Sequence, residues 1–109
     1  MKFDEYQKKA DGTALYKRIP GYEYIYPVLG LAGETGEVVE KFKKMIRADE
    51  ALTDDKKIEI KKELGDVLWY LSQIGTELGI SLEEIALANL EKIEDRKKRG
   101  VLHSSGDNR

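Results

Sequence analysis

Apolar side chains recur at intervals of three and four residues along three segments of this chain, and that period limits what the chain can fold into. Between positions 54 and 78 the recurring residues are Ile60, Leu64, Val67, Leu68, Leu71, Ile74 and Leu78. Residues spaced in this way lie along one side of an α-helix. We find no convincing strand pattern. The sequence therefore predicts an all-α fold.

Two further helices are expected from the same period, with a shorter and weaker one at about Phe3 to Leu15. The segment from about Pro27 or Val28 to about Arg47 has a stripe at Val28, Leu31, Ala32, Val38, Val39, Phe42 and Ile46. The segment from Leu82 to about Gly100 has one at Leu82, Ile85, Ala86, Leu90 and Ile93. Each stripe predicts a face that packs against the core.

Local signals set the ends of these helices. Thr53 or Asp54 can cap the helix that ends before Gly79, where a left-handed residue is usual. Ser81 followed by Glu84 is a capping box that opens the last helix. We predict one domain over residues 1–109, a four-helix bundle-like protomer whose segment 101–109 is an irregular tail.

Charge and composition exclude several classes of protein. The net charge is −2, from 19 basic and 21 acidic residues, which argues against binding a nucleic-acid polymer. The chain has no cysteine, so thiolate sites are excluded. The opening "MKFDEYQKKADG" is too polar for a signal peptide, and no apolar run approaches the roughly 18 residues of a membrane span. We expect a cytoplasmic protein without a membrane partner.

Two acid pairs at a spacing of three residues are the main functional signal. Glu34 and Glu37 form the first pair and Glu63 and Asp66 the second, with 25 residues between the pairs. Acids three apart lie side by side on a helix, where like charges repel. Four converging carboxylates would suit a cation such as Mg²⁺ or Mn²⁺. The alternative is that they are ordinary surface acids.

Glycines near these pairs favour the interpretation that the acids bind a cation. Gly30, Gly33 and Gly36 accompany the first pair, and Gly65 lies within the second. A glycine inside a helix costs about 0.5–1 kcal/mol relative to alanine. Close approach of another helix or of a ligand would compensate. The acids point away from the apolar stripes, so we expect them in a cleft between helices.

The stretches "GLAGETGEVVEKFKK" and "KKELGDVLWYLSQIGTELGISLEEIALANLEKIEDRKKRG" resemble the MazG-like all-α nucleoside triphosphate pyrophosphohydrolases. The resemblance covers about Gly30 to Gly100 and rests on E-x-x-E followed at a distance by E-x-x-D. It implies Mg²⁺-dependent cleavage between the α and β phosphates, giving a monophosphate and pyrophosphate. It also implies that Glu34, Glu37, Glu63 and Asp66 are catalytic metal ligands, with Glu37 a candidate to orient or deprotonate water.

The resemblance further implies that Asn89, Lys92 and Arg96 bind the substrate, and Lys44 is a weaker candidate. From the residues alone, a basic last helical turn offsets the helix dipole, and an amide within an apolar stripe is usually a satisfied core group. Both interpretations stay open at this point.

Aromatic residues raise the question of a partner. Trp69 falls opposite the apolar stripe of its helix. A tryptophan exposed there is usually buried by another subunit, which favours a homodimer or homotetramer. The tyrosines of "YKRIPGYEYIYP" either cover the core or offer a stacking surface to a planar ligand. The alternative to an enzyme is a non-catalytic helical oligomerisation module that binds a nucleotide or a metal.

Overall fold

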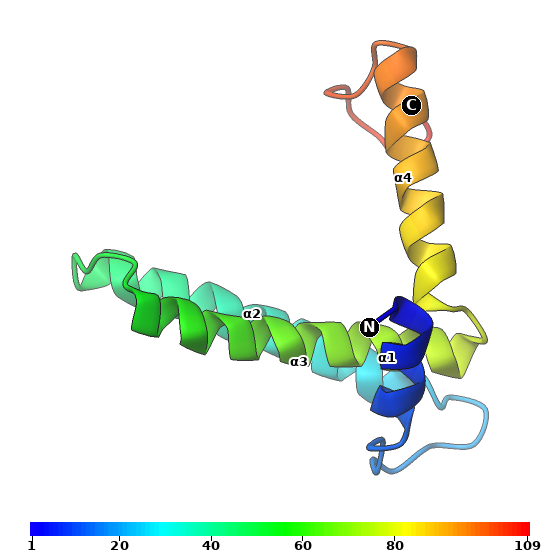
Figure 1. Ribbon diagram of the computed structural model, residues 1–109, viewed down its shortest axis with the longest axis horizontal. Coiled ribbons are helices and arrows are strands. Elements are labelled where there is room, and N and C mark those ends of the chain that lie inside the picture. The colour runs from blue at the N-terminus through cyan, green and yellow to red at the C-terminus, as the bar shows by residue number, and fades with distance from the viewer.

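The structure, a computed structural model, describes residues 1–109 and contains four α-helices and no β-strand. They are α1 (Phe3–Asp11), α2 (Ile25–Arg47), α3 (Asp54–Leu78) and α4 (Leu82–Lys98). α2 and α3 lie side by side as an antiparallel hairpin, and α4 projects from the end of α3 as a separate arm (Figure 1). The radius of gyration is 16.9 Å, well above the roughly 13 Å of a compact domain of this size. The all-α prediction is confirmed, but the single chain does not close into a four-helix bundle.

The helix ends follow local capping chemistry. The Thr53 hydroxyl accepts a hydrogen bond from the Lys56 amide at 3.3 Å and opens α3. Gly79 ends α3 with φ +71°, in the left-handed region. At the start of α4 the Ser81 hydroxyl accepts from the Glu84 amide at 3.0 Å, and the Glu84 carboxylate accepts from the Ser81 amide at 2.8 Å. Caps of this kind are each worth about 1 kcal/mol, and the predicted boundaries of α3 and the start of α4 are confirmed.

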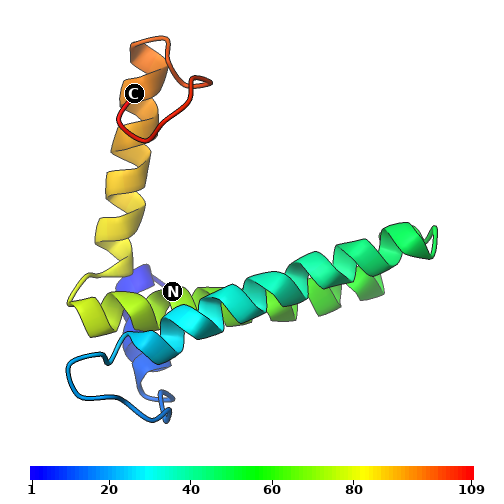
Figure 2. The same ribbon diagram turned by 180° about the vertical axis from the view of Figure 1, so that it is seen from behind.

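α1 lies across the junction between the hairpin and α4, as Figure 2 shows from behind. Gln7 donates to the Ile80 carbonyl at 3.0 Å and to the Thr76 hydroxyl at 3.2 Å, and it accepts from the Leu82 amide at 2.9 Å. Gly75 permits the turn, because a Cβ there would lie 2.7 Å from the Ile80 oxygen. One side chain therefore ties together both sides of the α3–α4 connection. α1 ends at Asp11, four residues before the expected end.

The tail over residues 101–109 is not helical and folds back along the end of α4. The Arg109 guanidinium donates to the carbonyls of Val101 at 3.1 Å and Leu102 at 3.0 Å. Arg96 of α4 donates to the Asp107 carbonyl. Arg99 donates to the Arg109 carbonyl, so three arginines hold the tail in place.

Few apolar side chains are buried within one chain. The buried hydrophobic residues are Ala10, Ala14, Ile60 and Leu82. On α2, Val39, Phe42 and Ile46 are 59%, 42% and 82% exposed, so the prediction that this stripe lies in the core is wrong for the single chain. The reason is that α3 packs against the neighbouring side of α2, which carries Gly30, so within the stripe only Leu31 and Val38 are half-buried.

None of the four helices combines the length and the apolar character needed to cross a lipid bilayer.

Candidate functional site

Three carboxylates meet between α2 and α3. Glu34 projects from α2, Glu63 and Asp66 project from α3, and one oxygen from each lies within 4.8 Å of the others. The spacing of three puts Glu63 and Asp66 on one face of α3, and the antiparallel pairing brings Glu34 opposite them. Glu34 and Glu63 are half-buried and Asp66 is exposed. We call Glu34, Glu63 and Asp66 the acid cluster.

The acids of the cluster affect one another's charge. Burial, then a hydrogen bond with Glu63, and then the negative charges of Asp66, Glu63 and Glu37 raise the pKa of Glu34 above its usual value. A raised carboxyl pKa means that the ionised form is disfavoured in the absence of a cation. Any bound positive charge would reverse this effect. The cluster is therefore electrostatically suited to a cation.

The chain itself supplies only a partial counter-charge. Lys41 of α2 lies with its Nζ 4.0 Å from Glu63 Oε1 and 3.9 Å from Glu59 Oε2. No other lysine or arginine forms an ion pair with the acid cluster. Carboxylate oxygens are the ligands that Mg²⁺ and Mn²⁺ prefer. The residues present therefore fit a divalent cation.

Glu37 is the one predicted acid that lies outside the cluster. Its side chain is exposed and lines a neighbouring pocket of about 180 Å³, together with Lys41 and Lys44 of α2 and Lys56 of α3. It is still close enough for its charge to raise the pKa of Glu34. The structure thus brings together three of the four predicted acids and places the fourth beside them.

The glycines near the acids differ in their surroundings. A Cβ added at Gly30 would lie 2.2 Å from the Tyr70 ring, so this glycine is needed for α2 to pack against α3. Additions at Gly33, Gly36 and Gly65 would meet nothing within 4 Å. The expected close approach is therefore observed at Gly30 alone within one chain.

Sequence reasoning missed two tyrosines beside the acids. Burial, then the Asp66 charge, raises the pKa of Tyr6, which comes from α1. For Tyr70, burial and then Tyr26, followed by the charges of Glu34 and Asp66, raises the pKa. Tyr70 is four residues after Asp66, and that spacing could have placed it on the same face. Tyr6 carries no such local signal.

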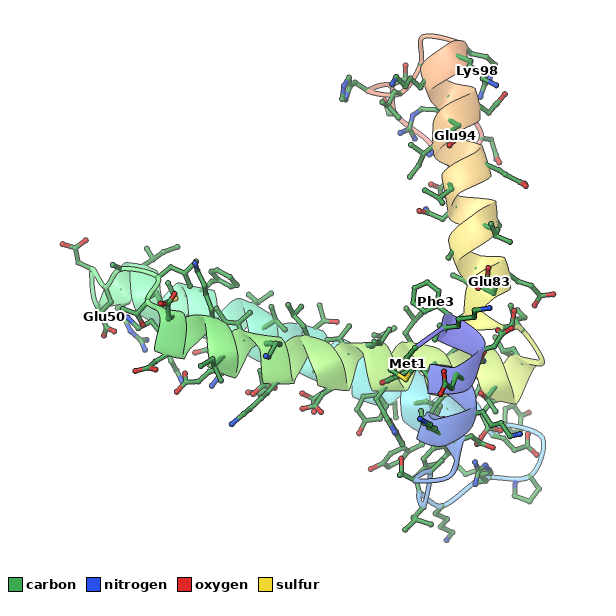
Figure 3. The ribbon with its side chains drawn as sticks, in the orientation of Figure 1. Met1, Phe3, Glu50, Glu83, Glu94 and Lys98 are labelled. Atoms are coloured by element: carbon green, nitrogen blue, oxygen red, sulfur yellow. The ribbon has the colours of Figure 1, made fainter.

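The predicted substrate residues of α4 lie on the arm. Asn89 and Lys92 are exposed and line a shallow groove there, so Asn89 is not a core amide. Arg96 is only 6% exposed because the tail covers it. Figure 3 shows the arm projecting away from the hairpin, with Glu94 and Lys98 toward its free end. Within one chain, these residues do not join the acid cluster.

Trp69 is covered by its own chain. Its indole nitrogen donates to the Thr13 hydroxyl at 3.0 Å, and its ring packs edge-on against Tyr16 and Tyr70. Tyr16 in turn stacks on Tyr26, with ring centroids 5.0 Å apart. The loop aromatics therefore cover the hairpin, and Trp69 does not by itself call for a partner.

The chain is thus an all-α protein with a carboxylate cluster between two antiparallel helices, a donor set that fits a divalent cation. Comparison with known families sharpens this class: residues 26–101 match the model of the MazG nucleotide pyrophosphohydrolase domain. The chain belongs to this family, as the sequence resemblance predicted.

A similar curated protein is the Gene 37 protein of Mycobacterium phage L5. It is 40% identical over 116 residues, and the match covers the whole of both chains. No solved structure matches this chain.

Proposed function

We propose that this protein hydrolyses nucleoside triphosphates between the α and β phosphates, releasing a nucleoside monophosphate and pyrophosphate in a Mg²⁺-dependent reaction. Membership of the nucleotide pyrophosphohydrolase family supports the reaction class. The observation that carries the proposal is the acid cluster, with three carboxylates from two helices within 4.8 Å. No histidine, cysteine or serine nucleophile is required.

The acid cluster would hold the metal through Glu34, Glu63 and Asp66. A divalent cation held there would neutralise phosphate charge and lower the pKa of a bound water. In the reaction a water oxygen bonds to the α-phosphorus, and the bond from that phosphorus to the α–β bridging oxygen breaks. The electron pair leaves with the diphosphate. Glu37, exposed beside the cluster, would accept the proton of the water.

The remaining phosphate partners in this proposal are Asn89, Lys92 and Arg96 on the arm, and Arg96 would exchange the Asp107 carbonyl of the tail for a phosphate oxygen. Cationic and amide groups of this kind bind phosphate oxygens through charge-assisted hydrogen bonds. Because the arm points away from the hairpin, we propose that the working site contains the acid cluster of one copy and the arm of another.

Exposed apolar surface supports a homo-oligomer. Val39 and Ile46 of α2 and Leu87 and Leu90 of α4 are all more than half exposed. On α2, Val39 and Ile46 line one apolar groove together with Phe42, and exposed apolar side chains that are grouped in this way mark an interaction site more often than scattered ones. Light scattering on the purified protein would measure the mass; a strictly monomeric protein would contradict this part of the proposal.

The test of the reaction is a product assay on a panel of ribo- and deoxynucleoside triphosphates with Mg²⁺. We expect monophosphate and pyrophosphate, and a loss of about 100- to 10,000-fold in kcat for Glu37→Gln, as for removal of a general base. Glu94→Gln, an exposed acid on the arm, is the matched control and should keep full activity. Orthophosphate as the first product, or full activity of Glu37→Gln, would refute the proposal. Mg²⁺-dependent binding without turnover would instead indicate a non-catalytic module.

A further inference from the structure

A pocket beside the acid cluster has, apart from Glu37 at its edge, no role in the reaction as described so far. It lies between α2 and α3, on the side of the cluster toward the α2–α3 connection, and has a volume of about 180 Å³. This is room for about six waters at roughly 30 Å³ each. Glu37, the proposed base, lines it, so the pocket adjoins the place where the anhydride bond would break.

Two lysines of this pocket are not committed to fixed partners. Lys44 is exposed and forms no ion pair within 4.0 Å. Lys41 is only loosely held, at 4.0 Å from Glu63 and 3.9 Å from Glu59. Lys56, by contrast, is fixed by the Glu50 carboxylate and by the Ala51 carbonyl at 3.0 Å. Lys41 and Lys44 are therefore the cations free to meet an anion.

The lining charge determines which anion the pocket can take. It contains three lysines and four glutamates, so the lining is slightly negative overall. A bare phosphate would be repelled by the glutamates, and this repulsion is weaker for an anion whose charge is partly neutralised by its own cation. A diphosphate bound to Mg²⁺ is such an anion, and the net negative charge that it keeps can be met by the two lysines. It is also the leaving group of the proposed reaction.

We propose that Lys41 and Lys44 form the subsite for the leaving diphosphate of the substrate, in the pocket next to the acid cluster. This inference rests on the proposed function. Lys41 has two successive partners: in the free protein it partly neutralises Glu63, and with metal and substrate bound its ammonium group turns to the phosphate oxygens. Lys44 has no such earlier partner and binds only the phosphate oxygens.

This dual role gives the two lysines different signatures. Lys41→Gln removes a competing positive charge from Glu63, so it should tighten Mg²⁺ binding about two- to fivefold in the absence of nucleotide. Lys44→Gln should leave Mg²⁺ binding unchanged. Both variants should weaken binding of Mg²⁺-pyrophosphate about tenfold and raise KM by a similar factor. Binding of the monophosphate product should not change.

The experiment is calorimetric titration of the intact protein and its variants with MgCl₂ alone, with pyrophosphate plus Mg²⁺, and with pyrophosphate plus a chelator. Lys43→Gln is the matched control, because Lys43 lies on the same helix, pairs with Glu40 and does not line this pocket. Wild-type protein should bind pyrophosphate only with Mg²⁺, and Lys43→Gln should behave like wild type. Circular dichroism checks that each variant stays helical.

The outcomes separate this inference from the proposed function. If wild type releases pyrophosphate but both pocket variants bind Mg²⁺-pyrophosphate normally, the subsite is wrong and the reaction stands. If Lys43→Gln weakens binding of Mg²⁺-pyrophosphate equally, the effect comes from the overall charge of the helix, and the proposed subsite is wrong. A protein that binds Mg²⁺-pyrophosphate through Lys41 and Lys44 but hydrolyses no triphosphate would keep the subsite and refute the reaction.

Discussion

The hairpin and the arm hold different halves of the proposed site and are built in different ways. In the hairpin, α2 and α3 hold each other along their length and place three acids within 4.8 Å. The arm is a single helix whose cations, Lys92 and Arg96, contact only solvent or the tail. The contrast teaches that one chain can complete the metal-binding half of the proposed site, while the phosphate-binding half depends on what the arm meets.

The largest expected effect comes from removing a carboxylate of the acid cluster in the hairpin. Glu63→Gln removes a ligand charge from the centre of the acid cluster, and we expect kcat to fall by about 1000-fold, since metal stabilisation of the transition state is worth several kcal/mol. Mg²⁺ affinity, measured by calorimetry without nucleotide, should fall in parallel. Unchanged Mg²⁺ affinity in this variant would show that the acid cluster is not the metal site.

Mixing two inactive proteins tests whether hairpin and arm act across copies. Glu63→Gln supplies an intact arm, and the Lys92→Ala/Arg96→Ala double variant supplies an intact acid cluster. If a dimer shares its sites, random exchange of subunits should restore about a quarter of wild-type activity. The assay is turnover after mild unfolding and refolding of the mixture. No recovery, despite mixed species seen by mass spectrometry, would mean that both halves act within one chain.

A smaller effect is expected from the arm alone. Lys92→Ala removes one charge-assisted contact to phosphate, so KM should rise about tenfold while Mg²⁺ affinity without nucleotide stays unchanged. Lys98→Ala, at the exposed end of α4 (Figure 3), is the control and should leave KM unaltered. Equal effects of the two variants would reduce the role of the arm to diffuse electrostatic attraction.

The smallest effects concern stability of the hairpin. Gly30→Ala forces the Tyr70 ring to move, which should destabilise the fold by about 1–3 kcal/mol. Gly33→Ala meets open space and should stabilise it by about 0.5–1 kcal/mol. Urea unfolding of both variants measures the difference. Destabilisation by Gly33→Ala would contradict the open surroundings seen in one chain and indicate that another molecule fills that space.

Features that depend on neighbouring residues could be predicted from the sequence. The box of Ser81 and Glu84, the left-handed Gly79 and the extent of α3 all follow from local hydrogen bonding and backbone preference. The same holds for acids three residues apart on one helix. Family membership was also correctly inferred from the motif and its surroundings.

Features that depend on how helices meet could not be predicted. Periodicity identified the stripe of α2 but not which side of α2 faces α3, so Val39 and Ile46 were wrongly placed in a core. The same missing information explains why Glu37 lies one step outside the acid cluster and why α4 leaves the hairpin. Lys41 was missed because its link to Glu63 spans two helices.

The hydrogen bonds of Gln7 to both sides of the α3–α4 connection fix the direction in which α4 leaves α3. Leu82 opens α4, and Arg96 lies fourteen residues further on, about 21 Å along the helix at 1.5 Å per residue. At that distance a rotation of roughly 10° about the Gly79–Ser81 connection displaces Arg96 by about 4 Å, more than the length of a hydrogen bond. The side-chain amide of Gln7 in α1 holds this connection and thereby determines which positions the cations of the arm can reach.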